Sequence, residues 1–318
     1  MKNLDGLLDF HTHSTHSDGS LSPKELVREA KRKGVYSLAL TDHNTISGLA
    51  EFREECKHQG IIGIPFGVEI YAELPKDILS ESDNRAPDLV ILGKNANPEP
   101  FYQYEKNLLN YFRKVFVIET VRKLESIGFR FPIQKVKDQC EVLKSKLESP
   151  PKIFHEFLSF PGNLENLIRI LKKEGVNSEE VIGKEISYAN RYLFAIGRPA
   201  YVDRISGFNI SDALALSKSM NTKLFIAHPG GKFFGALRQE IIDFYINSGI
   251  DGIEVRNYFN SLEQNSRFDR TAKEKGLIRS GGSDYHGANG VSKIGMYDLF
   301  ENQLPREMLE ELMDKLPS

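Results

Sequence analysis

Short apolar runs alternate with amphipathic segments along the first ninety residues. The apolar runs predict strands at 7–11, 36–40, 61–70 and 89–92, and the segments between the first three predict helices at 22–34 and 48–59. The first helix has clear end signals, because Ser22 and Glu25 form a capping box around Pro23, and Gly34 suits its C-terminal end. Strands that alternate with helices favour parallel βαβ units.

A long helical stretch then interrupts the alternation. Helix-like patterns dominate residues 95–202, and breaks that contain Pro and Gly separate them. The alternation resumes with strands predicted at 223–227, 252–256 and 277–281, and helices at 237–248 and 262–275. We therefore expect an α/β domain formed by 1–94 and 203–318, with 95–202 as a helical insertion. About seven strands suit a closed barrel or a doubly wound sheet on periodicity alone.

Histidines and carboxylates recur where the apolar runs end. These clusters contain His11, His13, Asp18, His43, Glu69, His228, Asp284 and His286. Imidazole nitrogens and carboxylate oxygens bind divalent transition metals when no thiolate takes part. Alternate strand residues point to one face, so His11 and His13 can reach the same ion. Beside His43, Asp42 is expected to orient a ligand rather than bind metal.

The position of the clusters bears on both fold and function. A single histidine after a strand is more often a cap or a surface residue, so the weight comes from the co-occurrence of many such residues at strand ends. Barrel enzymes place their active sites at the C-terminal ends of their strands. The pattern therefore favours a barrel over an open sheet and indicates a metallohydrolase.

Composition narrows the classes of function. The 318 residues carry 42 basic and 44 acidic side chains in mixed order, so the net charge of −2 gives no general basic surface for duplex nucleic acid or an anionic membrane. The first residues do not form a signal-peptide pattern, and no apolar run is long enough to span a bilayer. Cys56 and Cys140 lie far apart and indicate reduced thiols. We expect a cytoplasmic protein.

The order of the clusters resembles the PHP family, named for polymerase and histidinol phosphatase. The matching segments are Asp-Phe-His11-Thr-His13, Ser-Asp18-Gly19, Leu-Thr-Asp-His43, Gly-Val-Glu69, Ala-His228-Pro and Gly-Ser-Asp284-Tyr-His286-Gly, spread over residues 7–290. Within the family, the chain is most similar to stand-alone phosphoesterases that hydrolyse nucleoside bisphosphates and short oligonucleotides. The resemblance implies a distorted (β/α)7 TIM-like barrel with a helical insertion, and two or three divalent metal ions (Mn, Fe or Zn).

The resemblance also implies how the ligands are shared. One ion would lie among His11, His13, Glu69 and Asp284; Glu69 would bridge to a second ion that His228 binds; and Asp18, His43 and His286 would bind a third. Such ions activate water for the hydrolysis of a phosphomonoester. His228 or His286 would protonate the leaving alkoxide.

The fourth predicted strand departs from the family pattern. Family members commonly carry a histidine shortly before its terminal Leu-Gly, where this chain has Val90. Asp88 points to the same face of a regular strand, but we expect it to lie ~6–7 Å further back. We therefore expect the ion held by Glu69 and His228 to be the most weakly bound.

Three further residues are candidates for substrate binding: His155, Arg198 and Lys232. The alternatives are an ordinary helix-surface histidine for His155 and a structural arginine in a Gly-Arg-Pro loop for Arg198. The insertion is expected to cap the C-terminal mouth of the barrel. The expected substrate is a nucleotide, such as a nucleoside 3′,5′-bisphosphate, or a short oligonucleotide. The alternative functions are a histidinol-phosphate phosphatase and a non-catalytic PHP module that partners a polymerase.

Overall fold

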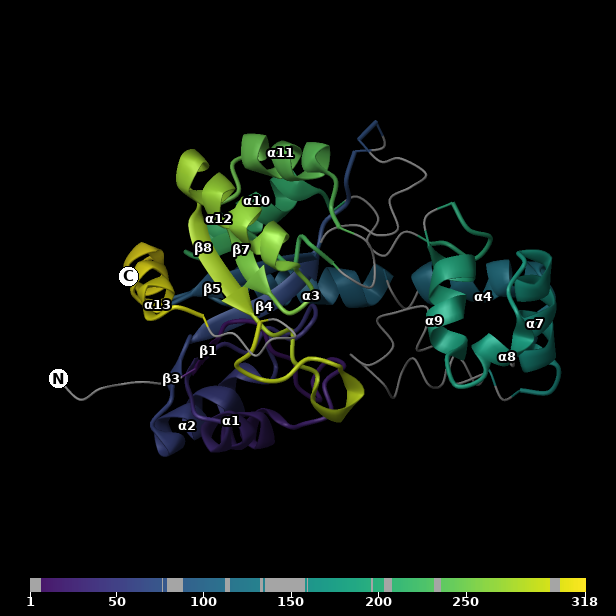
Figure 1. Cartoon of the computed structure of the whole chain (residues 1–318), viewed down its shortest axis with the longest axis horizontal. Coiled ribbons are helices and arrows are strands. Elements are labelled where there is room, and N and C mark those ends of the chain that lie inside the picture. Colours follow the sequence, from purple (N-terminus) through teal and green to yellow (C-terminus); the bar gives the residue numbers. More distant parts are fainter. Residues whose placement is uncertain are drawn as a thin grey trace. The chain divides into compact units, whose positions relative to one another are not determined.

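The chain folds into two compact units in a computed structural model that describes residues 7–75, 77–78, 88–111, 115–131, 134, 158, 160–195, 197–202, 208–231, 236–297 and 304–318. The sheet unit comprises Met1–Ile78, Ala86–Glu105 and Phe208–Ser318. The helical unit comprises Leu79–Arg85 and Lys106–Gly207. Figure 1 labels the elements of both units.

The strands of the sheet unit form two sheets. In the first, β1 (Leu7–Asp9), β2 (Val35–Leu38) and β3 (Ile62–Gly63) are parallel and adjacent in that order. The second contains β4 (Phe66–Tyr71), β5 (Asp88–Gly93), β6 (Lys223–Ile226), β7 (Gly252–Asn257) and β8 (Ile278–Gly282). A strand is therefore present in each predicted apolar run, but the single strand predicted at 61–70 is divided into β3 and β4, which belong to different sheets. The mixed α/β class is confirmed.

One strand runs against the predicted direction. β5 is antiparallel to both β4 and β6, whereas β6, β7 and β8 are parallel. An antiparallel pair needs no crossover helix, and none lies between Tyr71 and Asp88 among the residues that the structure describes there. The expectation of uniformly parallel βαβ units is thus wrong for β5, and the first residue of β5 lies at the edge where β4 and β6 end.

Backbone hydrogen bonds connect the two sheets at both of their ends. Phe10 N–H donates to the carbonyl of Gly281 at 3.2 Å, which joins the end of β1 to β8. Ile64 N–H donates to the carbonyl of Leu38 at 2.8 Å, and Asn44 N–H donates to that of Glu69 at 2.7 Å. These contacts tie the segment after β2 to β4 and bring the ends of the strands together.

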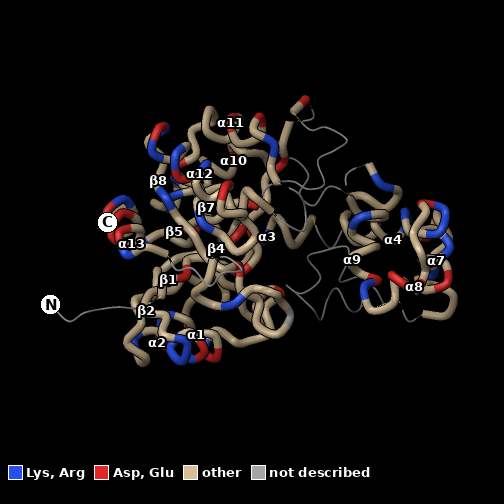
Figure 2. The backbone as a smooth tube through the Cα atoms, viewed as in Figure 1, with Lys and Arg blue, Asp and Glu red and all other residues tan. Residues whose placement is uncertain are grey.

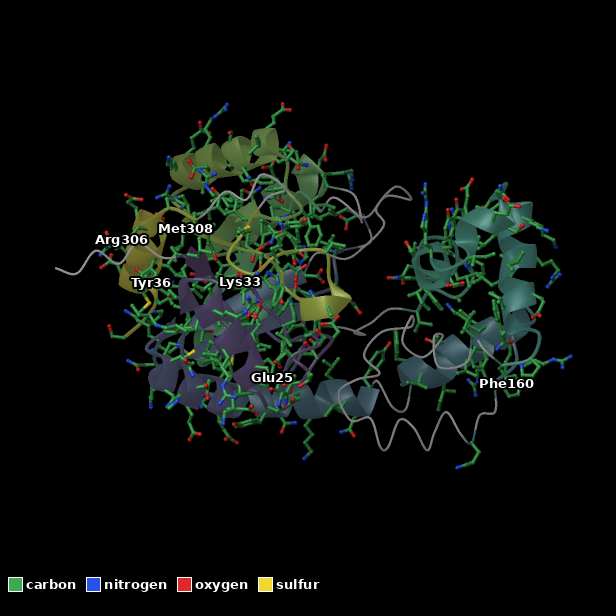
Figure 3. The ribbon with its side chains drawn as sticks, turned by 60° about the horizontal axis from the view of Figure 1, so that its bottom comes forward. Glu25, Lys33, Tyr36, Phe160, Arg306 and Met308 are labelled. Atoms are coloured by element: carbon green, nitrogen blue, oxygen red, sulfur yellow. The ribbon has the colours of Figure 1, made fainter. Side chains whose placement is uncertain are left out.

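Helices cover the strands of the sheet unit (Figure 1). The helices of this unit are α1 (Pro23–Arg32), α2 (Leu49–Gln59), α3 (Glu99–Tyr111, whose last residues belong to the helical unit), α10 (Ile210–Ser219), α11 (Gln239–Ser248), α12 (Leu262–Lys275), the short η3 (Gly287–Asn289) and α13 (Arg306–Lys315). The predicted capping box of α1 is confirmed, since Ser22 and Glu25 satisfy each other's backbone N–H groups; Glu25 is labelled in Figure 3.

The segment between β5 and β6 leaves and rejoins the sheet unit near one edge. Tyr104, on α3, donates its hydroxyl proton to the side-chain oxygen of Asn44 at 2.8 Å. On the return, Glu73 N–H donates to the carbonyl of Phe208 at 2.8 Å. Because Asn44 follows β2 and Glu73 follows β4, both connections lie at the edge where those strands end.

The helical unit has an apolar core of its own. Its described elements are α4 (Val117–Ser126), α7 (Asn163–Lys173), α8 (Ser178–Val181), α9 (Glu185–Ala189) and the π-helix η2 (Asn190–Phe194). Val121, Leu124, Leu167 and Leu193 are among the buried residues that pack together. No helix in the described parts of the chain combines the length and apolarity needed to cross a bilayer.

Candidate metal centre

All eight residues predicted as metal ligands gather at the ends of the strands. They form three overlapping groups, and the donor atoms within each group lie within 4.8 Å of one another. Glu69 belongs to two of the groups and His13 to two, so the groups share ligands. The shared residues make the three groups parts of one centre.

The first group lies deepest in the sheet unit. His11 and His13 follow β1, Glu69 lies on β4, and Asp284 follows β8. The Nε2 atoms of His11 and His13 are each 3.2 Å from Glu69 Oε2, and 3.4 and 3.0 Å from Asp284 Oδ1. These imidazoles and Glu69 are fully buried, so four donors converge on one small volume away from bulk water.

The second group is partly exposed. It contains His13, Asp18, His43 and His286. Asp18 Oδ1 lies 3.2 Å from His286 Nε2, and Asp18 Oδ2 lies 3.8 Å from His43 Nε2. His286 Nδ1 lies 2.8 Å from the carbonyl oxygen of Asp284. Because a carbonyl only accepts hydrogen bonds, the proton of a neutral His286 is on Nδ1, which leaves Nε2 with a lone pair toward Asp18.

The third group contains Glu69, His228 and Asp88. His228 Nε2 is 3.0 Å from Glu69 Oε1 and 3.6 Å from Asp88 Oδ2. The expectation that Asp88 lies further back than Val90 is wrong, because it assumed a parallel β5. In the antiparallel strand the earlier residue is nearer the ligands, and Val90 is deeper, opposite Glu69 and Phe225.

Two buried carboxylates absent from the predicted site hold parts of the centre in position. Glu254, on β7, has Oε1 2.7 Å from His11 Nδ1 and accepts a hydrogen bond from His228 N–H at 2.6 Å. Asp9, on β1, accepts from the N–H and hydroxyl groups of Ser283 at 2.9 and 2.6 Å. Each of the two is an acidic residue isolated within an apolar run, which is the signal by which the sequence could have indicated them.

Asp42 fixes the turn that carries Asp18. Its carboxylate accepts hydrogen bonds from Ser14 N–H at 2.7 Å, and from the hydroxyls of Ser14 and Ser17 at 2.6 Å each. It belongs to none of the three donor groups found among the described residues. The geometry thus agrees with the expectation that His43 faces the other donors while its neighbour Asp42 supports them.

The centre is built from strongly interacting charges. Burial alone would raise the pKa of Glu69, but the surrounding histidines, His43 and His11 foremost, hold that pKa well below its usual value. The pKa of Asp284 is likewise held low against burial by His286 and His11. Burial would lower the pKa of His13, yet Asp284 and Glu69 raise it to about 10. The carboxylates are therefore ionised at neutral pH, and a divalent cation would compete with protons for the imidazoles.

The donor set fits divalent cations. Glu69 Oε2 is buried and makes no hydrogen bond, although imidazole nitrogens of His11, His13 and His43 lie 3.1–3.2 Å away. A buried carboxylate oxygen surrounded by nitrogens without a hydrogen bond is the arrangement expected of a metal ligand. Nitrogen and oxygen donors without thiolate suit Mn, Fe or Zn.

The strand ends also carry unusual backbone conformations. Asn44, His228 and Asp284 have φ angles of +53°, +26° and +54°. Such values are costly for residues other than glycine and persist where the surrounding structure enforces them, frequently at functional sites. Here the turns at His228 and Asp284, just after β6 and β8, aim these two side chains into the centre, and Asn44 comes directly after the ligand candidate His43.

Of the three predicted substrate-binding residues, the structure describes Arg198. His155 and Lys232 lie outside the described residues. Arg198, in the helical unit, has Nη1 3.3 Å from Glu174 Oε2, and its guanidinium lies over the ring of Tyr192 at 5.4 Å. These contacts give Arg198 a local structural role, whereas its contact with a substrate stays a prediction.

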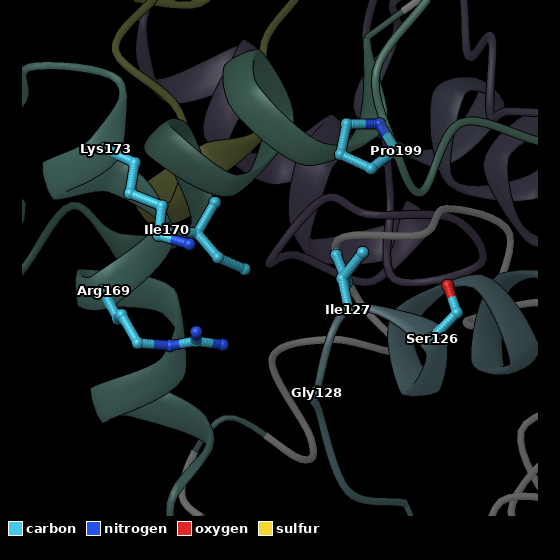
Figure 4. A pocket seen from close by; sticks show the side chains of 7 residues that line it. All are labelled: Ser126, Ile127, Gly128, Arg169, Ile170, Lys173 and Pro199. Atoms are coloured by element: carbon cyan, nitrogen blue, oxygen red, sulfur yellow. The ribbon is translucent and has the colours of Figure 1, made fainter.

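The helical unit contains a cavity of about 440 Å³ (Figure 4). Its lining includes Ser126 and Gly128 at the end of α4, Pro199, and the basic residues Arg169 and Lys173 of α7. Arg169 and Lys173 are one helical turn apart, so both present positive charge to the same side of α7.

Comparison with known proteins identifies the family. A model described as "PHP domain" matches residues 9–149. A 5′-3′ exoribonuclease from Haemophilus influenzae is 30% identical over 308 residues, which cover 93% of this chain and 96% of that protein. The chain belongs to the PHP family. A further relative, a 3′,5′-nucleoside bisphosphate phosphatase from Chromobacterium violaceum, is 27% identical over 288 residues, covering 88% of this chain and 87% of that protein.

Solved structures agree with this family at the level of the fold. A protein from Bifidobacterium adolescentis, provisionally described as a metal-dependent phosphoesterase, superimposes with a TM-score of 0.68 and 22% identity, covering 99% of this chain and 98% of that one. The curated relatives are a ribonuclease and a phosphatase, and the described residues include three groups of donors that could hold metal ions. On these grounds this PHP chain is a metal-dependent phosphoesterase, which argues against the alternative of a non-catalytic module.

Proposed function

We propose that this PHP phosphoesterase hydrolyses a phosphomonoester of a nucleotide, such as a nucleoside 3′,5′-bisphosphate, or of a short oligonucleotide. The observation that carries the proposal is the linking of three donor groups through His13 and Glu69. Shared ligands keep two or three cations close enough to act on one phosphate group. The relatives named for a nucleoside bisphosphate and for RNA support the choice of a nucleotide.

The residues of the centre would bind up to three cations. His11, His13, Glu69 and Asp284 would hold one cation, Asp18, His43 and His286 a second, and Glu69 with His228 a third. When bound, divalent cations stabilise the charge of phosphate oxygens and lower the pKa of water in contact with them. Glu254 keeps the proton of His11 on Nδ1, so that the lone pair of Nε2 can bind a metal ion.

The two histidines proposed as proton donors differ in geometry. The Nδ1 proton of His286 is committed to the carbonyl of Asp284, which favours a ligand role for this residue. His228 has Nε2 toward Glu69. Protonation of the leaving alkoxide by His228 or His286 stays part of the proposal.

Phosphate release tests the proposal. We expect kcat/KM with Mn²⁺ to be higher for 3′,5′-adenosine bisphosphate or a short 5′-phosphorylated oligoribonucleotide than for histidinol phosphate, and chelation to abolish turnover. His13→Ala should remove activity, because His13 belongs to two donor groups. His58→Ala, at an exposed position of α2, is the matched control. Preference for histidinol phosphate would select the alternative phosphatase, and turnover after complete chelation would exclude the metal mechanism.

We further propose that the strands close into a distorted (β/α)7 barrel, with the 95–202 insertion as a cap over its mouth. Counting β3 and β4 as one interrupted strand gives seven among the described residues, and the hydrogen bonds from Phe10 to Gly281 and from Ile64 to Leu38 support closure. The contacts of Tyr104 with Asn44 and of Phe208 with Glu73 show that both connections to the insertion begin at the ligand edge of the sheet unit, and the cap itself stays a prediction.

Arg198 provides a test of the cap. If Arg198 binds substrate and transition state alike, Arg198→Ala should raise KM more than it lowers kcat. Glu174→Gln removes the ion-pair partner of Arg198 without removing the guanidinium, and it should leave KM unchanged. An unchanged KM in Arg198→Ala, measured with the bisphosphate, would assign this arginine to the structure of the helical unit alone.

A further inference from the structure

The antiparallel direction of β5 brings its first residue, Asp88, to the third donor group. The resemblance to the PHP family leads us to expect a histidine near the end of this strand, where this chain has Val90. Asp88 is opposite Tyr71 in the register, and its carbonyl accepts a hydrogen bond from Ala227 N–H at 3.0 Å. Asp88 thus begins β5 beside the residue that precedes His228.

Alternation along the strand directs Asp88 toward the centre. Val90 is directly opposite Glu69, so the two side chains lie on one face of the sheet. Asp88, two residues earlier, shares that face. Its Oδ2 is 3.6 Å from His228 Nε2, and its side chain is 13% exposed. Asp88 thus adds a carboxylate oxygen to the third donor group, to which the apolar Val90 can supply no ligand atom. The donor atoms of Glu69, Asp88 and His228 lie within 4.8 Å of one another.

We infer that Asp88 is a metal ligand that replaces the absent imidazole and binds a cation together with Glu69 and His228. The inference rests on the proposed metal dependence and adds a ligand to it. Two carboxylates and one imidazole form a site that is richer in oxygen and more negative than a site in which a second histidine replaces Asp88. Oxygen donors favour harder cations, so this site should prefer Mn²⁺ or Fe²⁺ over Zn²⁺ relative to an imidazole-rich one. With Asp88 as a ligand, this ion is no longer expected to be the weakest bound.

Metal stoichiometry tests the inference without reference to turnover. Asp88→Asn keeps the shape of the side chain and removes its charge. We expect equilibrium dialysis followed by elemental analysis to show about one Mn²⁺ fewer per chain than in the wild type, or an affinity for one Mn²⁺ at least ~10-fold lower. Asp243→Asn, at an exposed position of α11, is the matched control and should keep the wild-type stoichiometry.

A second variant, which should restore metal binding, distinguishes the loss of a ligand from a general loss of structure. Val90→His in the Asp88→Asn background returns an imidazole to the same face and should recover the missing Mn²⁺. Thermal unfolding in chelator should be the same for Asp88→Asn and the wild type, because no ion is then bound. Manganese anomalous scattering from wild-type crystals should place an ion in direct contact with an Asp88 oxygen.

The outcomes separate this inference from the proposed function. If Asp88→Asn binds as many Mn²⁺ ions with unchanged affinity, or if no anomalous peak lies near Asp88, Asp88 is not a ligand, while metal-dependent turnover of the wild type still stands. If the wild type itself binds no Mn²⁺ and hydrolyses nucleotides in chelator, the proposed function fails first.

Discussion

Individual ligands in this centre depend on further residues that hold them. Glu254 contacts His11 through one oxygen and the backbone of His228 through the other, so a single buried side chain positions ligands from the ends of β1 and β6. A carboxylate behind a metal-binding imidazole fixes its tautomer and raises its basicity. One substitution at Glu254 should therefore affect two of the three donor groups.

Replacing Glu254 by Gln tests this dependence. The amide group offers one acceptor in place of two, so either His11 Nδ1–H or His228 N–H is left without its partner. We expect the affinity for Mn²⁺ to fall ~10- to 100-fold, with kcat reduced at saturating metal. Isothermal titration calorimetry with Mn²⁺ gives the affinity, and Glu263→Gln, exposed on α12, serves as control. Wild-type affinity in Glu254→Gln would show that His11 keeps its orientation without this carboxylate.

At the residue scale, the sequence predicts those ligands whose signals lie in neighbouring residues, and it does not predict contacts between residues far apart in the chain. His11 and His13 are recognisable as ligands because they are close in sequence and end an apolar run. The link between His11 and Glu254 joins residues 243 positions apart, so no local pattern indicates it. The sequence identifies Asp88 as a carboxylate near the predicted strand, but it does not predict that this carboxylate lies beside His228. That position depends on the direction of β5, which hydrophobic periodicity does not reveal.

At the scale of elements, the centre depends on the close approach of neighbouring strands. The segment after β1 contacts β8, and Gly282 of β8 lies against His11: a Cβ built on Gly282 would be 2.5 Å from both the backbone nitrogen and the Cβ of His11. Only glycine permits this approach. Apolar runs and capping boxes predict the strands and α1 well, because those signals are local, whereas pairing and direction depend on the whole sheet.

The variant Gly282→Ala should disturb the fold and the centre together. The added methyl group must displace His11 or β8, and overpacking of this kind costs about 1–3 kcal/mol. We expect a lower free energy of unfolding in urea and weaker Mn²⁺ binding. Gly276→Ala is an informative control, because its φ of +68° penalises alanine while no atom lies within 4 Å. It should be less stable and keep its Mn²⁺ affinity; equally weakened metal binding in both variants would refute a specific role for the packing of Gly282 on His11.

At the scale of the whole molecule, charge is divided unequally between the two units. The ranges of the helical unit contain 19 basic and 14 acidic residues, a net charge of +5, and those of the sheet unit contain 23 and 30, a net charge of −7. The overall value of −2 conceals this division. Figure 2 shows basic positions along α4 and α7 of the helical unit. A polyanionic substrate would therefore be attracted by the helical unit more than by the surface of the sheet unit.

This division predicts how substrate length and salt act together. If the helical unit binds the phosphodiester backbone, KM for a 5′-phosphorylated oligoribonucleotide should rise more steeply with NaCl than KM for 3′,5′-adenosine bisphosphate, because each neutralised phosphate releases counterions. Steady-state kinetics over a series of NaCl concentrations gives both slopes. Equal slopes for the two substrates in the wild type would mean that the charge of the helical unit does not act on the nucleic acid.

Arg169 and Lys173, which line the cavity of the helical unit, are the cations to remove. In Arg169→Ala/Lys173→Ala, log KM for the oligonucleotide should depend on log salt with a slope smaller by ~0.7 for each phosphate that is no longer neutralised, while the bisphosphate is hydrolysed as by the wild type. The control pair Lys218→Ala/Lys275→Ala removes the same charge from exposed positions of the sheet unit and should leave the slope unchanged. If both pairs reduce the slope equally, net charge alone governs the salt dependence, and the cavity of the helical unit does not bind the oligonucleotide.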